Sequence, residues 1–129
     1  MSATGQCLCG ATIYETTSAP KFAIRCYCSD CQRVTGGGSA PQVAFDSAAL
    51  TTNGPLKHHF ATSDEGNTLD FAFCGDCGSP LLKSTSKAPA MVFVYAGSLN
   101  DAATVPPLRD VFESSRPRWD RSGDTSEEE

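Results

Sequence analysis

Positive charge is scarce in this 129-residue sequence, which has ten lysine and arginine residues against fifteen aspartate and glutamate residues and a formal net charge of -5. No basic stripe exists that could neutralise phosphates, which argues against a nucleic-acid partner. Long apolar runs are missing too, since no segment approaches the roughly 18 consecutive apolar residues that span a bilayer. The first residues form neither a basic nor an apolar region, so we expect no signal peptide. We therefore expect a cytoplasmic protein without a membrane partner.

Helical periodicity is also scarce. Short segments rich in β-branched and aromatic residues alternate with glycine, proline and asparagine turns, which predicts an all-β fold of roughly seven short strands with few helical turns. Among them are a pair at residues 56–60 and 67–73, joined by a polar loop, and a last strand at residues 108–112. Residues 33–39, with glycine at 36–38, are expected to form neither a helix nor a strand. The chain suits a single domain, residues 1–121, before a disordered tail at 122–129 with four acids and no base.

Cysteine, in contrast, is abundant, and its spacing is informative. An odd number of cysteines in a reducing compartment favours metal ligation over disulfides. Four thiolates complete a tetrahedral structural zinc site, whereas three leave one coordination position open, as in catalytic zinc sites. We therefore assign the two outer pairs to a structural zinc and the central trio to a catalytic zinc, giving two zinc ions per chain. The outer pairs are Cys7, Cys9, Cys74 and Cys77, and the trio is Cys26, Cys28 and Cys31.

A zinc ion with three thiolate ligands has a formal charge of -1, so it is a weaker Lewis acid than zinc held by three histidines. An external thiol is a better fourth ligand than water, because soft sulfur ligands suit one another. Zinc would hold that thiol as its thiolate, which is the nucleophilic form. This favours carbon–sulfur chemistry. The alternative is that water or a side chain fills the fourth position and the second site is structural.

Several residues near the trio are candidates for further roles. Arg33 could bind the carboxylate of an anionic substrate through a bidentate contact, or it could simply be solvated. Gly37 and Gly38 either form a flexible turn or let the backbone approach the metal or a ligand closely. His58 and His59 are adjacent and should face opposite sides of a strand. One of them could supply a fourth ligand or a proton, although neither lies in a motif with metal-ligand spacing, which favours ordinary strand histidines.

Six segments together resemble one protein family over nearly the whole chain. They are residues 5–10, 26–31, 63–67, 73–79, 97–100 and 114–119. In them the sequence resembles the glutathione-dependent formaldehyde-activating enzyme (GFA) family, to which centromere protein V also belongs. Many relatives carry histidine between the first two cysteines of the trio, where this chain has Tyr27.

The resemblance implies a β-tent fold of short antiparallel strands, stapled by a structural zinc on the outer cysteine pairs, with a second zinc on the trio. It also implies the activity that names the family, the addition of glutathione to formaldehyde to give S-(hydroxymethyl)glutathione, formally a carbon–sulfur lyase reaction. The expected partners are a small thiol such as glutathione and a small aldehyde. Two alternatives stay open. One is a non-catalytic zinc scaffold that binds a protein or a thiol, and the other is an enzyme that catalyses a zinc-dependent reaction of another thioether or aldehyde.

Overall fold

The computed structural model describes residues 2–120, and the predicted acidic tail lies outside them. Ten strands, one α-helix and four 3-10 turns make up this part of the chain, so the all-β prediction is confirmed. In chain order the elements are β1 (Ala3–Gln6), β2 (Ile13–Thr16), β3 (Phe22–Cys26), α1 (Ser29–Thr35), β4 (Ala40–Asp46), η1 (Ser47–Ala49), β5 (Leu50–Asn53), β6 (Leu56–Thr62), β7 (Thr68–Cys74), β8 (Pro80–Thr85), β9 (Met91–Tyr95), η2 (Ala96–Ser98), η3 (Ala102–Thr104), β10 (Leu108–Val111) and η4 (Glu113–Ser115). No helix between residues 2 and 120 is long and apolar enough to cross a membrane.

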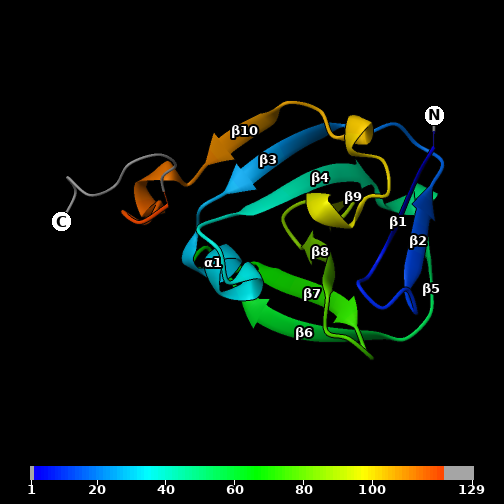
Figure 1. Ribbon diagram of the computed structural model, residues 1–129. Coiled ribbons are helices and arrows are strands. Elements are labelled where there is room, and N and C mark those ends of the chain that lie inside the picture. Colours follow the sequence, from blue (N-terminus) through cyan, green and yellow to red (C-terminus); the bar gives the residue numbers. More distant parts are fainter. Residues whose placement is uncertain (1, 121–129) are drawn as a thin grey trace.

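The strands form two sheets. A three-stranded sheet has the order β1-β2-β5, and a curved seven-stranded sheet has the order β10-β3-β4-β9-β8-β7-β6. Figure 1 shows the small sheet at one end of the molecule and α1 at the other, between β3–β4 and β6–β7. All pairings are antiparallel except that of β10 with β3, which is parallel because β10 arrives by a long connection from β9.

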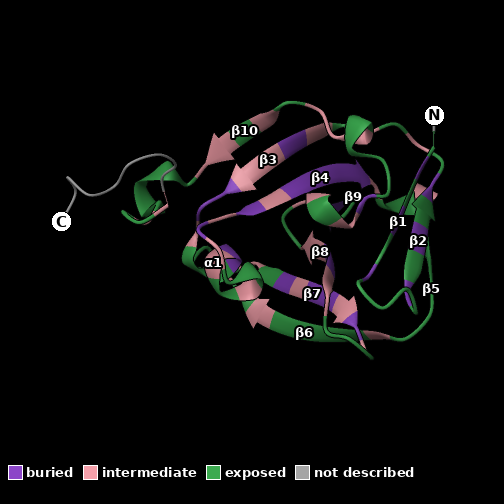
Figure 2. Ribbon diagram, viewed as in Figure 1, coloured by how far each residue is buried: buried purple, intermediate pink, exposed green. Residues whose placement is uncertain are grey.

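The core lies against the middle strands of the large sheet, where Figure 2 shows β4 buried along most of its length. Val43, Phe45, Leu81 and Val94 are almost completely inaccessible to solvent. A second, smaller cluster of buried residues contains Cys26, Cys31, Ala40 and Tyr95. The apolar core and the sulfur trio therefore share the strands β3, β4 and β9.

The prediction of an irregular segment at residues 33–39 is wrong for its first three residues, which belong to α1. The helix is capped at its N-terminus by Cys28, whose sulfur accepts a hydrogen bond from the backbone N–H of Cys31 at 3.4 Å. It ends at Gly36, which has a φ of 75° and donates its N–H to the carbonyl of Gln32. A glycine in the left-handed conformation is a common helix terminator, so the glycine run stops this helix and does not prevent it.

The predicted strand pair and the predicted last strand are found in the structure, which has ten strands where roughly seven were expected. The predicted strand pair forms the antiparallel hairpin β6–β7, and its polar loop closes with a hydrogen bond from the Ser63 N–H to the Asn67 carbonyl. The last predicted strand corresponds to β10.

Candidate functional site

The outer cysteine pairs come together where the two sheets meet. Cys7 and Cys9 follow β1, Cys74 ends β7, and Cys77 lies in the turn after it. All four sulfur atoms lie within 4.8 Å of one another, with 3.6 Å between those of Cys7 and Cys9 and 3.8 Å between those of Cys9 and Cys74. Two sulfurs of a tetrahedral zinc site with Zn–S bonds of about 2.3 Å lie about 3.8 Å apart. The geometry therefore fits a metal ion.

Hydrogen-bond donors surround the sulfurs of this four-cysteine cluster. The Thr12 hydroxyl donates to the sulfur of Cys74 at 3.4 Å, as do the backbone N–H groups of Asp76 and Cys77 at 3.3 and 3.4 Å. These bonds, the one from Thr12 first, lower the pKa of Cys74. The Ser79 hydroxyl likewise lowers the pKa of Cys77 to about 5. Donors that stabilise thiolates prepare the cluster for a cation.

The trio is built by the junction of β3 and α1. Cys26 ends β3, Cys28 caps α1, and Cys31 lies in the first turn of the helix. The three sulfurs lie within 4.8 Å of one another, and no fourth cysteine, histidine or carboxylate of residues 2–120 joins them. Cys26 and Cys31 are buried, whereas Cys28 is half-buried. The trio can thus hold a metal ion that keeps a position for an external ligand.

Without a metal, the three thiols share their protons unequally. Hydrogen bonds from Cys26 and Cys31 hold the pKa of Cys28 far below its usual range, and the ammonium group of Lys83 adds to this effect. The same sharing with Cys26 and Cys28 raises the pKa of Cys31. Negative charge is therefore concentrated on Cys28, the most accessible sulfur of the trio, and binding of a metal releases the remaining protons.

A cavity of about 460 Å³ opens onto the trio, and we call it the sulfur cavity. Cys26 and Cys28 lie in its wall, together with charged side chains from β8 and from the β6–β7 loop. The lining residues are Cys26, Cys28, Ser29, Asp30, Ser63, Asp64, Glu65, Asn67, Leu69, Lys83, Thr85, Lys87, Phe93 and Phe112. Phe112 has a φ of 56°, and no other described residue except glycine has a positive φ. Such strain in a bulky residue is typical of functional sites.

The predicted substrate contacts lie away from the sulfur cavity. Arg33 lines a second cavity, of about 330 Å³. A Cβ at Gly38 would collide with the side chain of Asp120, so this glycine makes room for the C-terminal segment. A Cβ at Gly37 would meet only Thr35 and Ser39. Roles for these three residues in substrate binding remain predictions.

The two histidines face opposite sides of β6, as expected. His58 pairs with Asp70 at 2.9 Å, and its ring stacks on Phe60. His59 lies opposite Phe71 in the hairpin and lines the second cavity. Neither histidine belongs to a metal-ligand group of the described residues.

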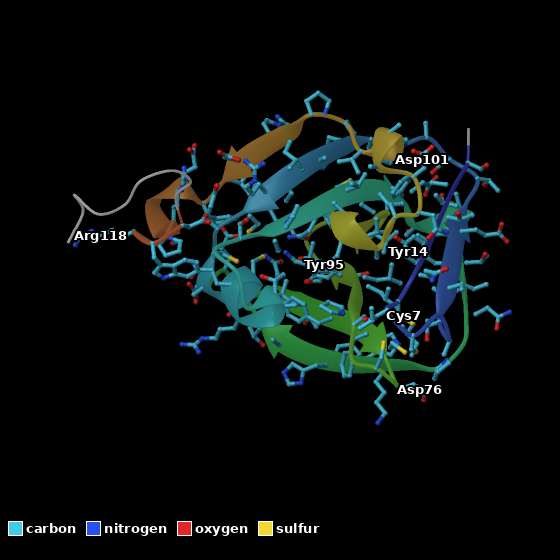
Figure 3. All side chains as sticks on the ribbon, viewed as in Figure 1. Cys7, Tyr14, Asp76, Tyr95, Asp101 and Arg118 are labelled. Carbon is cyan, nitrogen blue, oxygen red and sulfur yellow. The ribbon has the colours of Figure 1, made fainter. Side chains whose placement is uncertain are left out.

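Three residues near the sulfurs were missed by the sequence analysis. Thr12 and Gln42 are completely buried and donate hydrogen bonds to cysteine sulfurs, from Thr12 to Cys74 and from Gln42 to Cys31 at 3.6 Å. Tyr95 lies directly opposite Gln42 on the neighbouring strand β9. The only signal in the sequence was a glutamine within an otherwise apolar strand. Figure 3 shows Tyr95 toward the middle of the molecule and Cys7 beside Asp76 at its far end.

The buried donors give a reciprocal test of the two clusters. Gln42→Leu removes the donor to Cys31, and we expect the affinity of the trio for cobalt(II) or zinc(II) to fall by about 10–100-fold, the usual effect of losing such a partner. Thr12→Val should weaken the four-cysteine cluster to a similar degree. Competition titrations with a chromophoric chelator measure both affinities. Each variant is the control for the other. A single variant that weakened metal binding equally at both clusters would contradict the view that they are separate sites.

Comparison with known proteins places the chain among its relatives. The sequence profile described as "Glutathione-dependent formaldehyde-activating enzyme" matches residues 2–115. The chain belongs to this GFA family. A Halomonas elongata protein, provisionally named a glutathione-dependent formaldehyde-activating enzyme, is 29% identical over 122 residues, which cover 89% of this chain and 77% of that protein. The crystal structure of a Rhodobacter sphaeroides protein matches with a TM-score of 0.64 at 20% identity, over 84% of this chain and 99% of that one, and supports the fold.

Tyr27, the residue between the first two cysteines of the trio, contacts the C-terminal part of the described chain. It is buried, and the guanidinium group of Arg116 lies 5.5 Å from the centre of its ring. Arg116 also donates two hydrogen bonds to the carbonyl of Asp120. Arg116 therefore connects Tyr27 to residues 116–120.

Proposed function

We propose that the chain binds two zinc ions and that the trio, with the sulfur cavity, catalyses the addition of a glutathione-like thiol to a small aldehyde. The observation that carries this proposal is the arrangement of three sulfurs, without a fourth ligand among residues 2–120, beside a cavity lined by Cys26 and Cys28. Membership of the GFA family supports the same reaction. When bound at the trio, zinc would lower the pKa of an external thiol and hold it as the nucleophilic thiolate. The cytoplasm is a suitable setting, since it keeps such thiols reduced.

The charges of the sulfur cavity suit glutathione, which carries two carboxylates and one ammonium group. Lys83 and Lys87 can pair with carboxylates, and Asp64 and Glu65 can pair with an ammonium group. The ammonium nitrogen of Lys87 lies 3.6 Å from a carboxylate oxygen of Glu65. This ion pair is exposed, so charged groups of a ligand can replace either partner at little cost in free energy. A volume of about 460 Å³ is also within the usual range for small-molecule sites.

The reaction needs a nucleophile and a proton donor. The thiolate sulfur attacks the carbonyl carbon, a carbon–sulfur bond forms, and the electron pair of the carbonyl double bond moves to the oxygen. The oxygen takes a proton, and the proton lost from the thiol balances the addition. Lys83 is half-buried, and its ammonium group acts on the charges of both Cys28 and Cys31. We assign to Lys83 Nζ the stabilisation of the developing alkoxide and the donation of the proton.

Exchange NMR between free glutathione, formaldehyde and their adduct tests this function, because the reaction also proceeds without an enzyme. The zinc-loaded protein should accelerate the exchange without changing the equilibrium, and Lys83→Met should reduce the acceleration by about 10-fold or more. Lys57→Met, which changes an exposed lysine of β6 outside the sulfur cavity, is the matched control. If the wild-type protein bound the thiol but did not accelerate the exchange, the proposed enzymatic activity would be contradicted. That result would support a thiol-binding scaffold.

A further inference from the structure

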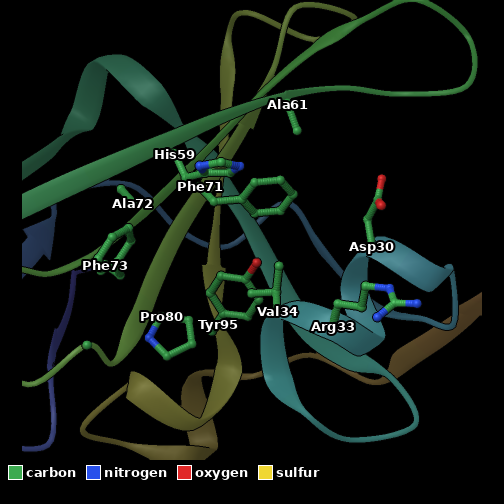
Figure 4. Close-up of a pocket in the computed structure, with 11 residues that line it drawn as sticks. Asp30, Arg33, Val34, His59, Ala61, Phe71, Ala72, Phe73, Pro80 and Tyr95 are labelled. Atoms are coloured by element: carbon green, nitrogen blue, oxygen red, sulfur yellow. The ribbon is translucent and has the colours of Figure 1, made fainter.

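The second cavity lies between α1 and the β6–β7 hairpin, and its lining includes none of the seven cysteines. Its inner surface is largely apolar, with Val34 from the helix and Phe71, Phe73 and Pro80 from the sheet side. The volume of about 330 Å³ is at the lower end of the range for small-molecule sites. Figure 4 shows these side chains arranged around the hydroxyl group of Tyr95.

That hydroxyl group has no hydrogen-bond partner within the described chain. Tyr95 is only 6% exposed, and its oxygen is buried and unpaired. The comparable buried tyrosine, Tyr14, pairs its hydroxyl with Ser98 at 2.6 Å. A buried polar group without a partner destabilises the folded protein, so such groups usually have a partner in the working protein. In Figure 4 the Tyr95 oxygen points toward Phe71, among the lining residues.

A phenol hydroxyl carries one hydrogen that it can donate. The buried, unpaired hydroxyl of Tyr95 can therefore donate this hydrogen to an acceptor atom in the cavity.

The edge of the cavity carries a cation. Arg33 is exposed at the edge that α1 forms, and it makes no ion pair with residues 2–120. His59 also lines the cavity. The carboxylate of Asp30 is nearby, but it is exposed and faces the sulfur cavity as well. A planar guanidinium group in this position is suited to a carboxylate.

We propose that the second cavity binds a small carboxylic acid that has a flat apolar body and a hydroxyl or keto oxygen at its far end. The body packs against Phe71 and Phe73, the carboxylate binds Arg33, and the far oxygen accepts a hydrogen bond from Tyr95. This site adjoins the sulfur cavity, with which it shares only Asp30 in its lining, and it does not depend on the function proposed for the trio.

Three probe compounds separate the two polar contacts. Titration of the metal-loaded full chain, followed by NMR or calorimetry, should give 4-hydroxybenzoate the highest affinity. Benzoate, which lacks the far oxygen, should bind about 3–10-fold more weakly, the range for one hydrogen bond. Phenol, which lacks the carboxylate, should also bind more weakly, and this difference should shrink at high salt. Equal affinities for the three compounds, or no binding, would overturn the proposal.

Two variants assign the contacts to residues. Tyr95→Phe should abolish the preference for 4-hydroxybenzoate over benzoate, and Arg33→Gln should abolish the preference over phenol. Tyr14→Phe and Arg109→Gln, which change a tyrosine and an arginine outside the cavity, should keep both preferences. A Tyr95→Phe protein that keeps its preference for the hydroxylated acid would contradict the assignment. Displacement of 4-hydroxybenzoate by glutathione would show that the two cavities are one site.

Discussion

Replacing Cys77 with serine is expected to leave the chain unfolded or insoluble. Cys77 is exposed, so a serine at this position removes little apolar burial by itself. If the cluster holds zinc as proposed, the variant loses a metal ligand between β1 of the small sheet and β7 of the large one. A structural zinc contributes about 10–16 kcal/mol to folding in small domains, which is as much as the whole stability of a typical domain, about 5–15 kcal/mol. Soluble yield, circular dichroism and bound metal measure the effect.

Ser79→Ala is the matched control for Cys77→Ser. The hydroxyl of Ser79 lies 3.2 Å from the sulfur of Cys77, so the alanine variant removes a neighbour of the ligand and keeps all four sulfurs. We expect it to fold with a slightly weakened metal site. A Cys77→Ser protein as well folded as the wild type would mean that the four-cysteine cluster has no structural role.

Cys28→Ser, unlike Cys77→Ser, is expected to keep the fold and to lose the proposed activity. Cys28 is half-buried and lines the sulfur cavity, so its change leaves the apolar core intact. Two sulfurs should hold metal far more weakly than three, so bound zinc should fall from two ions per chain toward one. The acceleration of adduct formation should fall by about 100-fold or more, as for the loss of a group that acts on the transition state. Metal analysis, circular dichroism and exchange NMR on the same sample test all three expectations.

Ser29→Ala is the control for this variant, because Ser29 is the next residue and lines the same cavity without offering a sulfur. It should keep two metals and most of the acceleration. A Cys28→Ser protein with wild-type acceleration would show that the trio is not the reaction centre.

The grouping of the cysteines could be predicted from the sequence because it depends on local spacing. Cysteines two or three residues apart bring their sulfurs to one point through short turns, and the count of seven then separates four from three. The structure brings together the same four and the same three. The hairpin β6–β7 was predictable for the same reason, since a polar loop joins two clear strands.

The surroundings of the trio could not be predicted, because they depend on a helix and on strand pairings that the sequence alone does not reveal. Cys31 and Arg33 are two residues apart, about 200° around a helix with 3.6 residues per turn, so Arg33 points away from the sulfurs. This helix was not predicted, so the sequence did not show that Arg33 lines the second cavity and not the sulfur cavity. Gln42 and Tyr95 meet through the register of β4 with β9, which joins residues more than fifty positions apart. The wall of the sulfur cavity likewise comes from β3, α1, β8 and the β6–β7 loop.

Cobalt(II) substitution tests most directly the central claim, that the trio's metal accepts an external thiol. Thiolate-to-cobalt charge-transfer bands strengthen when a further sulfur binds, so glutathione should raise these bands in the fully loaded protein. S-methylglutathione, which has the same charges without a free thiol, should leave them unchanged, and Cys31→Ser should abolish the response. No spectral change with glutathione, or an equal change with S-methylglutathione, would contradict the account.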